Sequence, residues 1–138
     1  MKRAKGFTLV ELVIVIVIVG ILSIVAVPIY RGYTRKAMAT EAKSLLGSIQ
    51  TAEKVYYAEM SEYLVGDNIS FEAALDVDAR ANKYFTSYTI EPEGTAGTDG
   101  YKFIATVEGL TGTPAANIKM TLKSGVSGKP EWTEEGLN

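Results

Sequence analysis

The sequence contains no cysteine and no histidine. The absence of cysteine excludes disulfide bonds, thiolate nucleophiles and cysteine metal ligands. The absence of histidine removes the commonest general base and the commonest metal ligand. A carboxylate or lysine enzyme is still possible by composition. These absences nevertheless argue against catalysis, and we expect neither an enzyme nor a bound cofactor or metal.

An excess of basic side chains is also absent. The chain has 14 basic and 16 acidic side chains and a net charge of −2. Lys2, Arg3 and Lys5 precede Gly6, and the 11 basic and 16 acidic side chains that remain without them give −5. Binding to a phosphate backbone needs a basic face, so we expect no nucleic-acid partner. Hydrophobic residues make up 47% of the chain, which is enough for an ordered core.

A long apolar run lies near the N-terminus. Residues 12–30 are 19 residues without a charged side chain, and a helix needs about 20 residues to cross the hydrocarbon core of a membrane. A secretory signal peptide has a shorter apolar stretch, of roughly 7–15 residues, followed by a small-x-small cleavage site. No such site follows Tyr30. The run therefore predicts a membrane-spanning helix, with an ordinary signal anchor as one alternative.

One acidic side chain, Glu11, lies inside the longer, otherwise almost wholly apolar stretch of residues 7–30. A carboxylate within a membrane span is costly and normally has a partner. Lys5 lies six residues earlier, on another face of a helix, and the span itself contains no basic residue. Cleavage between Gly6 and Phe7 would create an α-amino group on Phe7 that could pair with Glu11 of the same chain or of a neighbour. Such a pair would also reject wrong axial offsets between neighbouring chains.

The segment Gly6-Phe7-Thr8-Leu9-Val10-Glu11 follows a short basic leader and precedes about 20 apolar residues. This combination resembles the class III signal of type IV pilins and pseudopilins. The resemblance is dense over residues 1–30, extends along the helix to about residue 63 and then fades. It implies a leader peptide at residues 1–6, a transmembrane or filament-core helix at 7–30, and a periplasmic or extracellular head at 31–138.

The resemblance also implies a processing and assembly route. A prepilin peptidase would cut between Gly6 and Phe7 on the cytoplasmic side, Phe7 would be N-methylated, and Glu11 would pair with the Phe7 amine of an adjacent subunit. The partners would be further copies of the chain in a homopolymeric filament, the peptidase, an inner-membrane assembly platform, a cytoplasmic assembly ATPase and, before assembly, membrane lipid. The chain would cross the cytoplasmic membrane once, with its N-terminus in the cytoplasm, and later reside in a surface pilus or a periplasmic pseudopilus.

Gly20 and Pro28 lie where the long helix could loosen. Pro28 lacks a backbone donor and its ring clashes with the carbonyl of Ile24. The resemblance implies that the region between Gly20 and Pro28 can unwind in the filament. For Gly20, close packing against another helix explains a small residue equally well.

Beyond residue 30 the apolar pattern becomes amphipathic. One helical face has spacings of 4, 3, 4, 3, 4 and 4 residues and consists of Met38, Ala42, Leu45, Ile49, Ala52, Tyr56 and Met60. The opposite face is polar and consists of Thr40, Lys43, Ser44, Gln50, Glu53, Lys54 and Glu59. Gly47 is unfavourable inside a helix, which suggests that it permits close approach of a sheet. Together with the apolar run, this pattern predicts one helix over residues 7–60.

The remaining residues indicate an antiparallel sheet. Period-2 alternation predicts strands at 85–90, 101–107 and 118–122, and a last edge strand near Trp132. The turn-rich stretches 94–100 and 109–116 separate them. The helix face needs an apolar partner, and this sheet supplies it. The expected fold class is α+β, with one long helix packed on three or four antiparallel strands, as in type IV pilins.

Residues 61–84 are expected to form a loop with one short helix, capped by Ser70. Asn68 begins a glycosylation sequon, which in a bacterial protein is more often chance. Asp67, Asp76, Asp78 and Asp99 could ligate Ca²⁺, but no ordered ligand loop is visible and we favour solvated surface acids. The tyrosines along the helix could suggest electron conduction, and we favour core anchors and interfacial rings instead.

Three functions fit these observations. The favoured one is a structural subunit of a type IV pilus-like filament, and the alternative is a pseudopilin of a type II secretion system. A calcium ion bound in the head would favour the pseudopilin. A signal-anchored membrane protein of another function would retain an intact Met1. Pilin heads are often closed by a disulfide near the C-terminus, so here the last 15 residues must be held by packing or by neighbours.

Overall fold

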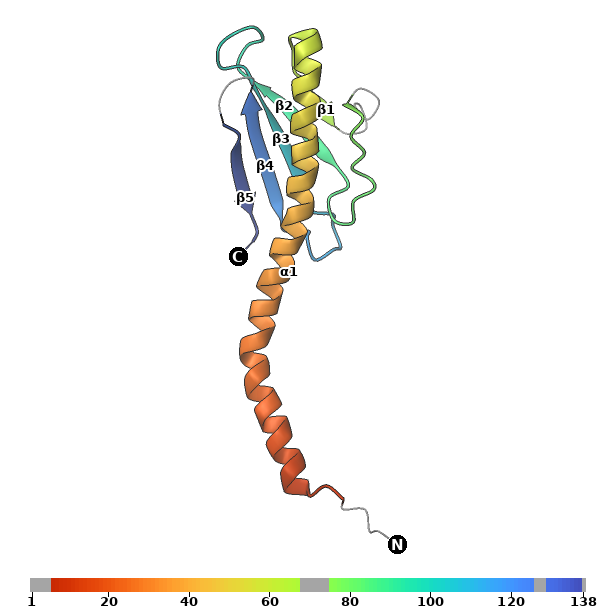
Figure 1. The fold of residues 1–138 in the computed structure, drawn as a ribbon, viewed down its shortest axis with the longest axis vertical. Helices are drawn as coiled ribbons and strands as arrows, with labels where there is room; N and C mark the ends of the chain where they lie inside the picture. The colour runs from red at the N-terminus through yellow and green to blue at the C-terminus, as the bar shows by residue number, and fades with distance from the viewer. Residues whose placement is uncertain (1–5, 68–74, 126–128, 138) are drawn as a thin grey trace. The chain divides into compact units, whose positions relative to one another are not determined.

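The structure, a computed structural model, describes residues 6–67, 75–125 and 129–137. It divides into two compact units, Met1–Thr34 and Arg35–Asn138, which are described separately below. One helix, α1 (Leu9–Met60), contributes to both units (Figure 1). The predicted α+β fold class is confirmed, with one long N-terminal helix and an antiparallel sheet packed on its second half.

In the N-terminal unit, α1 is a helix without a core. Its large apolar side chains from Leu9 to Tyr33 are all exposed within the chain. This part of α1 is long and apolar enough to cross a membrane and lies near the N-terminus, which fits a membrane anchor. The helix continues without a break through Gly20 and Pro28. A Cβ atom on Gly20 would meet no atom within 4 Å, so the described part of the chain supplies no packing partner there.

The C-terminal unit, called the head below, is a meander covered on one face by α1 (Figure 1). Every neighbouring pair of strands is antiparallel. The sheet order follows the chain order: β1 (Gly66–Asp67), β2 (Tyr88–Glu93), β3 (Lys102–Glu108), β4 (Lys119–Gly125) and β5 (Glu131–Glu135).

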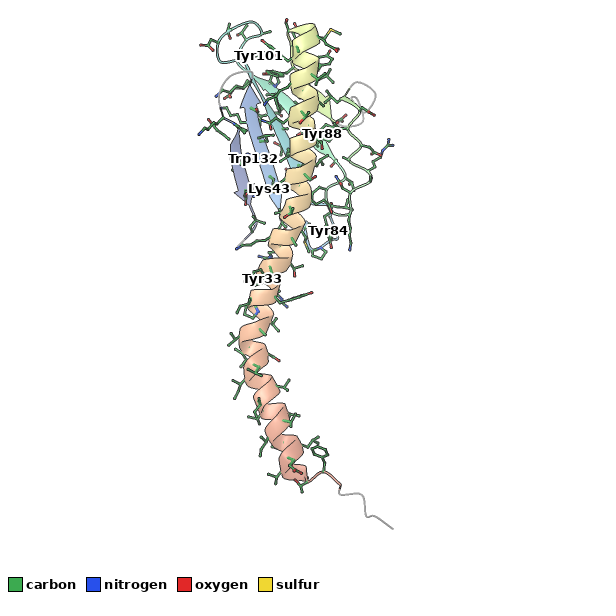
Figure 2. The ribbon with its side chains drawn as sticks, in the orientation of Figure 1. Tyr33, Lys43, Tyr84, Tyr88, Tyr101 and Trp132 are labelled. Atoms are coloured by element: carbon green, nitrogen blue, oxygen red, sulfur yellow. The ribbon has the colours of Figure 1, made fainter. Side chains whose placement is uncertain are left out.

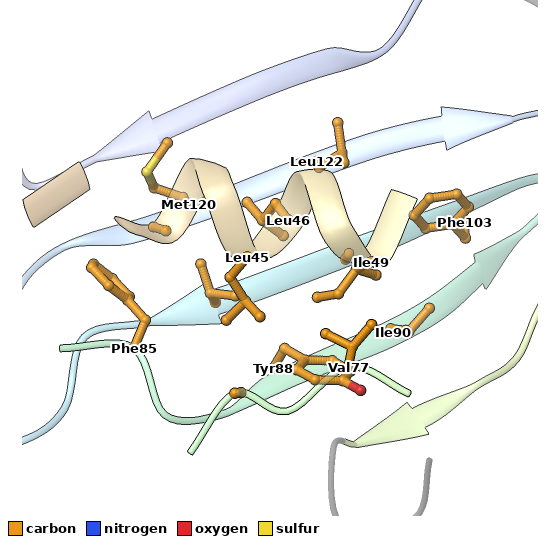
Figure 3. Close-up of a cluster of buried hydrophobic side chains, with 14 of the residues drawn as sticks. Leu45, Leu46, Ile49, Val77, Phe85, Tyr88, Ile90, Phe103, Met120 and Leu122 are labelled. Carbon is orange, nitrogen blue, oxygen red and sulfur yellow. The ribbon is translucent and has the colours of Figure 1, made fainter. Parts of the chain in front are cut away.

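The core lies between α1 and the inner face of the sheet (Figure 3). Leu46 and Ile49 of α1 are fully buried, as are Phe103 of β3 and Leu122 of β4. Alternate residues of β3 and β4 point into this layer because side chains in a strand alternate between the two faces of its sheet. Each large buried apolar side chain contributes about 1.5–3 kcal/mol relative to an exposed one. This layer therefore holds the head together.

The predicted apolar face of α1 is confirmed in its middle and wrong at its end. Met38, Ala42, Leu45 and Ile49 are buried, and Ala52 and Tyr56 are partly buried against the core. Met60 is 59% exposed. The aromatic rings of Tyr63 and Tyr101 fill the core near the helix end, with their centroids 4.9 Å apart, and leave Met60 outside. Ala39 and Leu46 are buried although the sequence analysis did not place them on this face.

Two predictions for the other face of α1 are wrong. Glu53 was expected on the polar face, and none of its surface is exposed, because the chain that follows α1 folds back over it. Gly47 was expected to permit close approach of the sheet. A Cβ atom built on Gly47 meets nothing within 4 Å, so the sheet does not approach the helix there.

The strands are largely where the sequence predicts them, with two corrections. The sheet has five strands, because β1 adds a two-residue pairing with β2 that was not expected. β2 begins at Tyr88, not at residue 85, because the backbone N–H groups of Tyr84 and Phe85 are bonded to Glu41 of α1 and are unavailable to a sheet. Pro92 is tolerated in β2 because β1 does not extend to that position.

The C-terminal end of the head is held without a disulfide. β5 pairs with β4 over five residues, which confirms the predicted edge strand near Trp132. Lys43 of α1 forms an ion pair with Glu134 of β5 at 2.5 Å, and Figure 2 shows Lys43 and Trp132 on these two elements. Leu137 packs partly against the core. Packing, a strand ladder and one ion pair therefore close the head.

The candidate calcium ligands do not converge in the described part of the chain. Asp67, Asp76, Asp78 and Asp99 are exposed, and residues 6–67, 75–125 and 129–137 contain no group of three or more acidic side chains arranged to hold a metal ion. Asp78 instead accepts a hydrogen bond from the backbone N–H of Arg80. Both Asn68 of the sequon and the short helix expected at Ser70 lie outside the described residues.

The open space at Gly47 generates a stability prediction. Replacing Gly47→Ala should raise the free energy of unfolding of the head by up to about 1 kcal/mol, since alanine is the better helix former and the added methyl group meets nothing. Thermal unfolding of the full chain in detergent micelles measures the effect.

Gly109→Ala is the matched control for this substitution. Its Cβ atom would lie 1.8 Å from the carbonyl oxygen of Ala115, so the same chemical change should lower stability there. A loss of stability in Gly47→Ala would show that the sheet does contact the helix at Gly47.

Candidate cleavage and assembly site

The predicted cleavage site lies just before the helix. Gly6 and Phe7 are in neither helix nor strand. The Phe7 side chain is 84% exposed, and a Cβ atom on Gly6 would meet nothing within 4 Å. Among the described residues, the Gly6–Phe7 bond is therefore accessible to an enzyme.

Thr8 and Glu11 form a capping box at the start of α1. The backbone N–H of Glu11 donates to Thr8 Oγ1 at 3.2 Å, while the backbone N–H of Thr8 donates to Glu11 Oε2 at 2.9 Å. The Thr8 hydroxyl also donates to Glu11 Oε2 at 2.7 Å. The two residues thus satisfy backbone donors that the first turn of a helix leaves free, which matters most in lipid, where no water can do so.

This arrangement gives Glu11 a local role that the sequence analysis missed. The signal was present, because Thr-x-x-Glu before an apolar run is the sequence pattern of a capping box. Only Oε2 of Glu11 is used by Thr8, and among the described residues no basic side chain pairs with Glu11. Both box residues follow the Gly6–Phe7 bond, so cleavage there would leave them in place.

Gly20 and Pro28 are not close to this site. They lie 9 and 17 residues after Glu11 on the same helix, which corresponds to about 14 and 26 Å at 1.5 Å per residue. The structure therefore brings together Gly6, Phe7 and Glu11, with Thr8 added, and leaves the predicted loosening region apart from them.

Two further carboxyl groups on α1 bind the loop that joins the helix to the sheet. Glu41 Oε1 accepts hydrogen bonds from the backbone N–H groups of Tyr84 at 2.6 Å and Phe85 at 3.2 Å. Glu53 Oε2 accepts one from the backbone N–H of Leu64 at 3.1 Å. Both ends of the loop are thus bonded to side chains of α1. The sequence carries no local signal for these contacts, since their partners are 11 to 44 residues away.

Taken together, the fold and the site define a class of protein. A helix that has no core of its own and is apolar enough to span a membrane continues into a small α+β head, and an accessible Gly-Phe bond precedes its capped start. A chain of this class has an exposed apolar helix that needs to be covered by lipid or by other chains, which fits a membrane anchor.

Comparison with known proteins agrees with this class. Residues 1–27 match the family model of the prokaryotic N-terminal methylation motif. The fimbrial protein EcpC of Eikenella corrodens is 36% identical over 124 residues, which cover 88% of this chain and 77% of that protein. A fimbrial protein of Neisseria meningitidis serogroup B is 41% identical over 87 residues, covering 63% of this chain and 50% of the relative. The type IV major pilin PilE1 of Neisseria gonorrhoeae is 53% identical over 53 residues, 38% of this chain and 32% of the relative.

The chain therefore belongs to the type IV pilin family. Its relatives are fimbrial and pilin proteins, so its role is that of a structural pilus subunit and not of an enzyme. The similarity to PilE1 covers little more than one third of this chain, whereas EcpC is similar over nearly all of it.

The capping box generates a prediction about the first turn of α1. Replacing Thr8→Val removes the side-chain oxygen of the cap and should destabilise this turn by about 0.5–2 kcal/mol. The expected result is faster amide exchange at residues 9–12 in detergent micelles. Thr8→Ser keeps the hydroxyl group and should behave like the wild type; equal exchange in Thr8→Val and wild type would contradict a stabilising cap.

Proposed function

We propose that this chain is a subunit of a type IV pilus-like helical filament that assembles after cleavage between Gly6 and Phe7 and N-methylation of Phe7. The observation that carries the proposal is the exposed Gly6–Phe7 bond directly ahead of a capped helix whose large apolar side chains from Leu9 to Tyr33 are exposed within the chain. Such a helix needs a second environment, and a bundle of identical helices provides one.

In this proposal a prepilin peptidase cuts on the cytoplasmic side of the membrane and creates an amino group on Phe7. Glu11 Oε2 already accepts two hydrogen bonds from Thr8, which leaves Oε1 to receive the Phe7 amine of an adjacent subunit. A carboxylate that gains its cation only at one axial offset sets the register of assembly. The capping box holds the carboxylate at the helix start until that neighbour arrives.

The apolar part of α1 is covered twice in this route. Lipid covers it before assembly, and neighbouring helices cover it afterwards. Contacts between different patches of successive copies, repeated along a screw axis, produce an open filament. Unwinding between Gly20 and Pro28 is the proposed adjustment during packing, since Pro28 already lacks one backbone donor. An inner-membrane assembly platform and a cytoplasmic ATPase are the proposed machinery of extraction.

The proposed location follows from the same route. The chain crosses the cytoplasmic membrane once, with its N-terminus in the cytoplasm, and its head reaches the cell surface in the assembled filament. The relatives reported above carry fimbrial and pilin names, which favours a surface pilus over the pseudopilus of a secretion system.

Processing is tested by mass spectrometry of the protein isolated from cells. The expected mature chain begins at Phe7 and carries one N-methyl group. Replacing Gly6→Val should block cleavage almost completely, because the branched side chain occupies the position of the scissile glycine. Gly32→Val, at a glycine outside the site where an added Cβ atom would also meet nothing within 4 Å, is the control and should be cleaved normally. A wild-type chain that begins at unmodified Met1 would end the proposal.

Intersubunit pairing is tested with Glu11→Val. This variant should insert into the membrane and be cleaved, but its yield of sheared filaments should fall at least tenfold because the register contact is lost. Thr8→Val is the matched control, since it removes the local cap and keeps the carboxylate. An equal loss of filaments in both variants would assign the effect to the cap and contradict the pairing.

A further inference from the structure

Glu53 is a buried carboxyl group with incomplete hydrogen bonding. None of its surface is exposed. Its Oε2 atom accepts the backbone N–H of Leu64, whereas its Oε1 atom is also buried and has no hydrogen-bond partner among residues 6–67, 75–125 and 129–137. An ionised carboxylate in such a place is costly unless a cation or several donors compensate it. The neutral acid is tolerated more easily.

Glu53 contacts the point at which the chain reverses direction after α1. This chain reversal, residues 61–64, begins with Ser61, whose φ of 61° and N–H bond to the carbonyl of Tyr57 end the helix. At its end, Leu64 is bonded to Glu53, and the backbone N–H of Tyr63 donates to the hydroxyl of Tyr101 at 3.4 Å. β1 follows at Gly66 and pairs over only two residues. The side chains of Tyr63 and Leu64 are buried in the core, and Glu53 adds the side-chain hydrogen bond that joins the backbone of the chain reversal to α1.

Phenol side chains lie on the elements next to Glu53, and the described residues include no ion-pair partner for it. The titratable side chains on the neighbouring elements include Lys54, Tyr56 and Tyr57 of α1, Glu62 and Tyr63 of the chain reversal, Asp67 of β1, Tyr88 of β2 and Tyr101 ahead of β3 (Figure 2 labels Tyr88 and Tyr101). In the described part of the chain none of them forms an ion pair with Glu53. Burial raises the pKa of Glu53 to about 7, and the Leu64 N–H bond offsets part of this effect.

We propose that Glu53 is a protonation-controlled contact: as the neutral acid it holds the chain reversal against α1, and loss of its proton loosens residues 61–67. The inference rests on the head alone and does not depend on the proposed processing or filament role. Glu41 provides a contrast at the other end of the same loop. It is partly exposed, and one of its oxygens receives two backbone N–H groups.

The direction of the pH dependence follows from the two environments of the group. When the chain reversal opens, Glu53 meets water and its pKa returns towards the ordinary 4.5, whereas in the closed state the pKa is about 7. The contact is therefore strongest below pH 4.5, weakens as the pH rises to about 7, and changes little above that value.

Amide exchange measured by NMR on the full chain in detergent micelles tests this inference. Protection at Leu64, corrected for the intrinsic exchange rate, should fall on the order of 50-fold between pH 5 and pH 8, as the two pKa values require. The amides of Tyr84 and Phe85, which are bonded to Glu41, are internal references and should not lose protection in parallel.

Glu53→Gln is the decisive variant, because it keeps an acceptor for Leu64 and cannot ionise. Its protection at Leu64 should be flat over the same pH range, while Glu59→Gln, an exposed substitution on the same helix, should follow the wild type. If Glu53→Gln does not fold, the wild-type titration against Tyr84 and Phe85 decides alone. Flat wild-type protection, or equal pH dependence in Glu53→Gln and wild type, would overturn the proposal.

Discussion

The packing of Leu46 and Ile49 of α1 against the inner face of the sheet is the interaction on which the rest of the head depends. The sheet has one apolar face, and α1 is the layer that covers it. Once the helix lies there, its polar side chains hold the remaining parts. Glu41 and Glu53 bind the two ends of the connecting loop, and Lys43 binds the last strand. The helix is thus both the cover of the core and the frame to which loop and terminus are fixed.

Periodicity explains why so much of this fold could be predicted from the sequence. The apolar run near the N-terminus, the helical spacing from Met38 to Ile49 and the alternation in β3 and β4 are local patterns, and local patterns survive in the final structure. The predictions were wrong where contact with a segment distant in the sequence determines burial or strand pairing. The helical pattern alone places Glu53 on the polar face of α1. It is buried because the chain after α1 folds back and the backbone N–H of Leu64 bonds to it. β1 is too short to leave any pattern, and its existence follows from where that returning chain meets β2.

The candidate site divides in the same way. Glu11 could be selected from the sequence because an acid within an apolar span is costly, and Gly6 and Phe7 because the segment resembles the class III signal. What the structure adds is Thr8, which turns an isolated acid into half of a helix cap. Glu11 can therefore be hydrogen-bonded within its own chain through Oε2 and still keep Oε1 for a neighbouring chain.

The closure of the C-terminal end has a consequence for how the head responds to its surroundings. A covalent bridge would tie the last strand to the core with a strength set by redox conditions. Here a five-residue ladder and a partly exposed ion pair between Lys43 and Glu134 perform that task. Both are reversible, and the ion pair weakens as salt screens it. The last strand can therefore detach and pair again without any covalent bond being broken or formed. Oxidants and reductants leave its attachment unchanged.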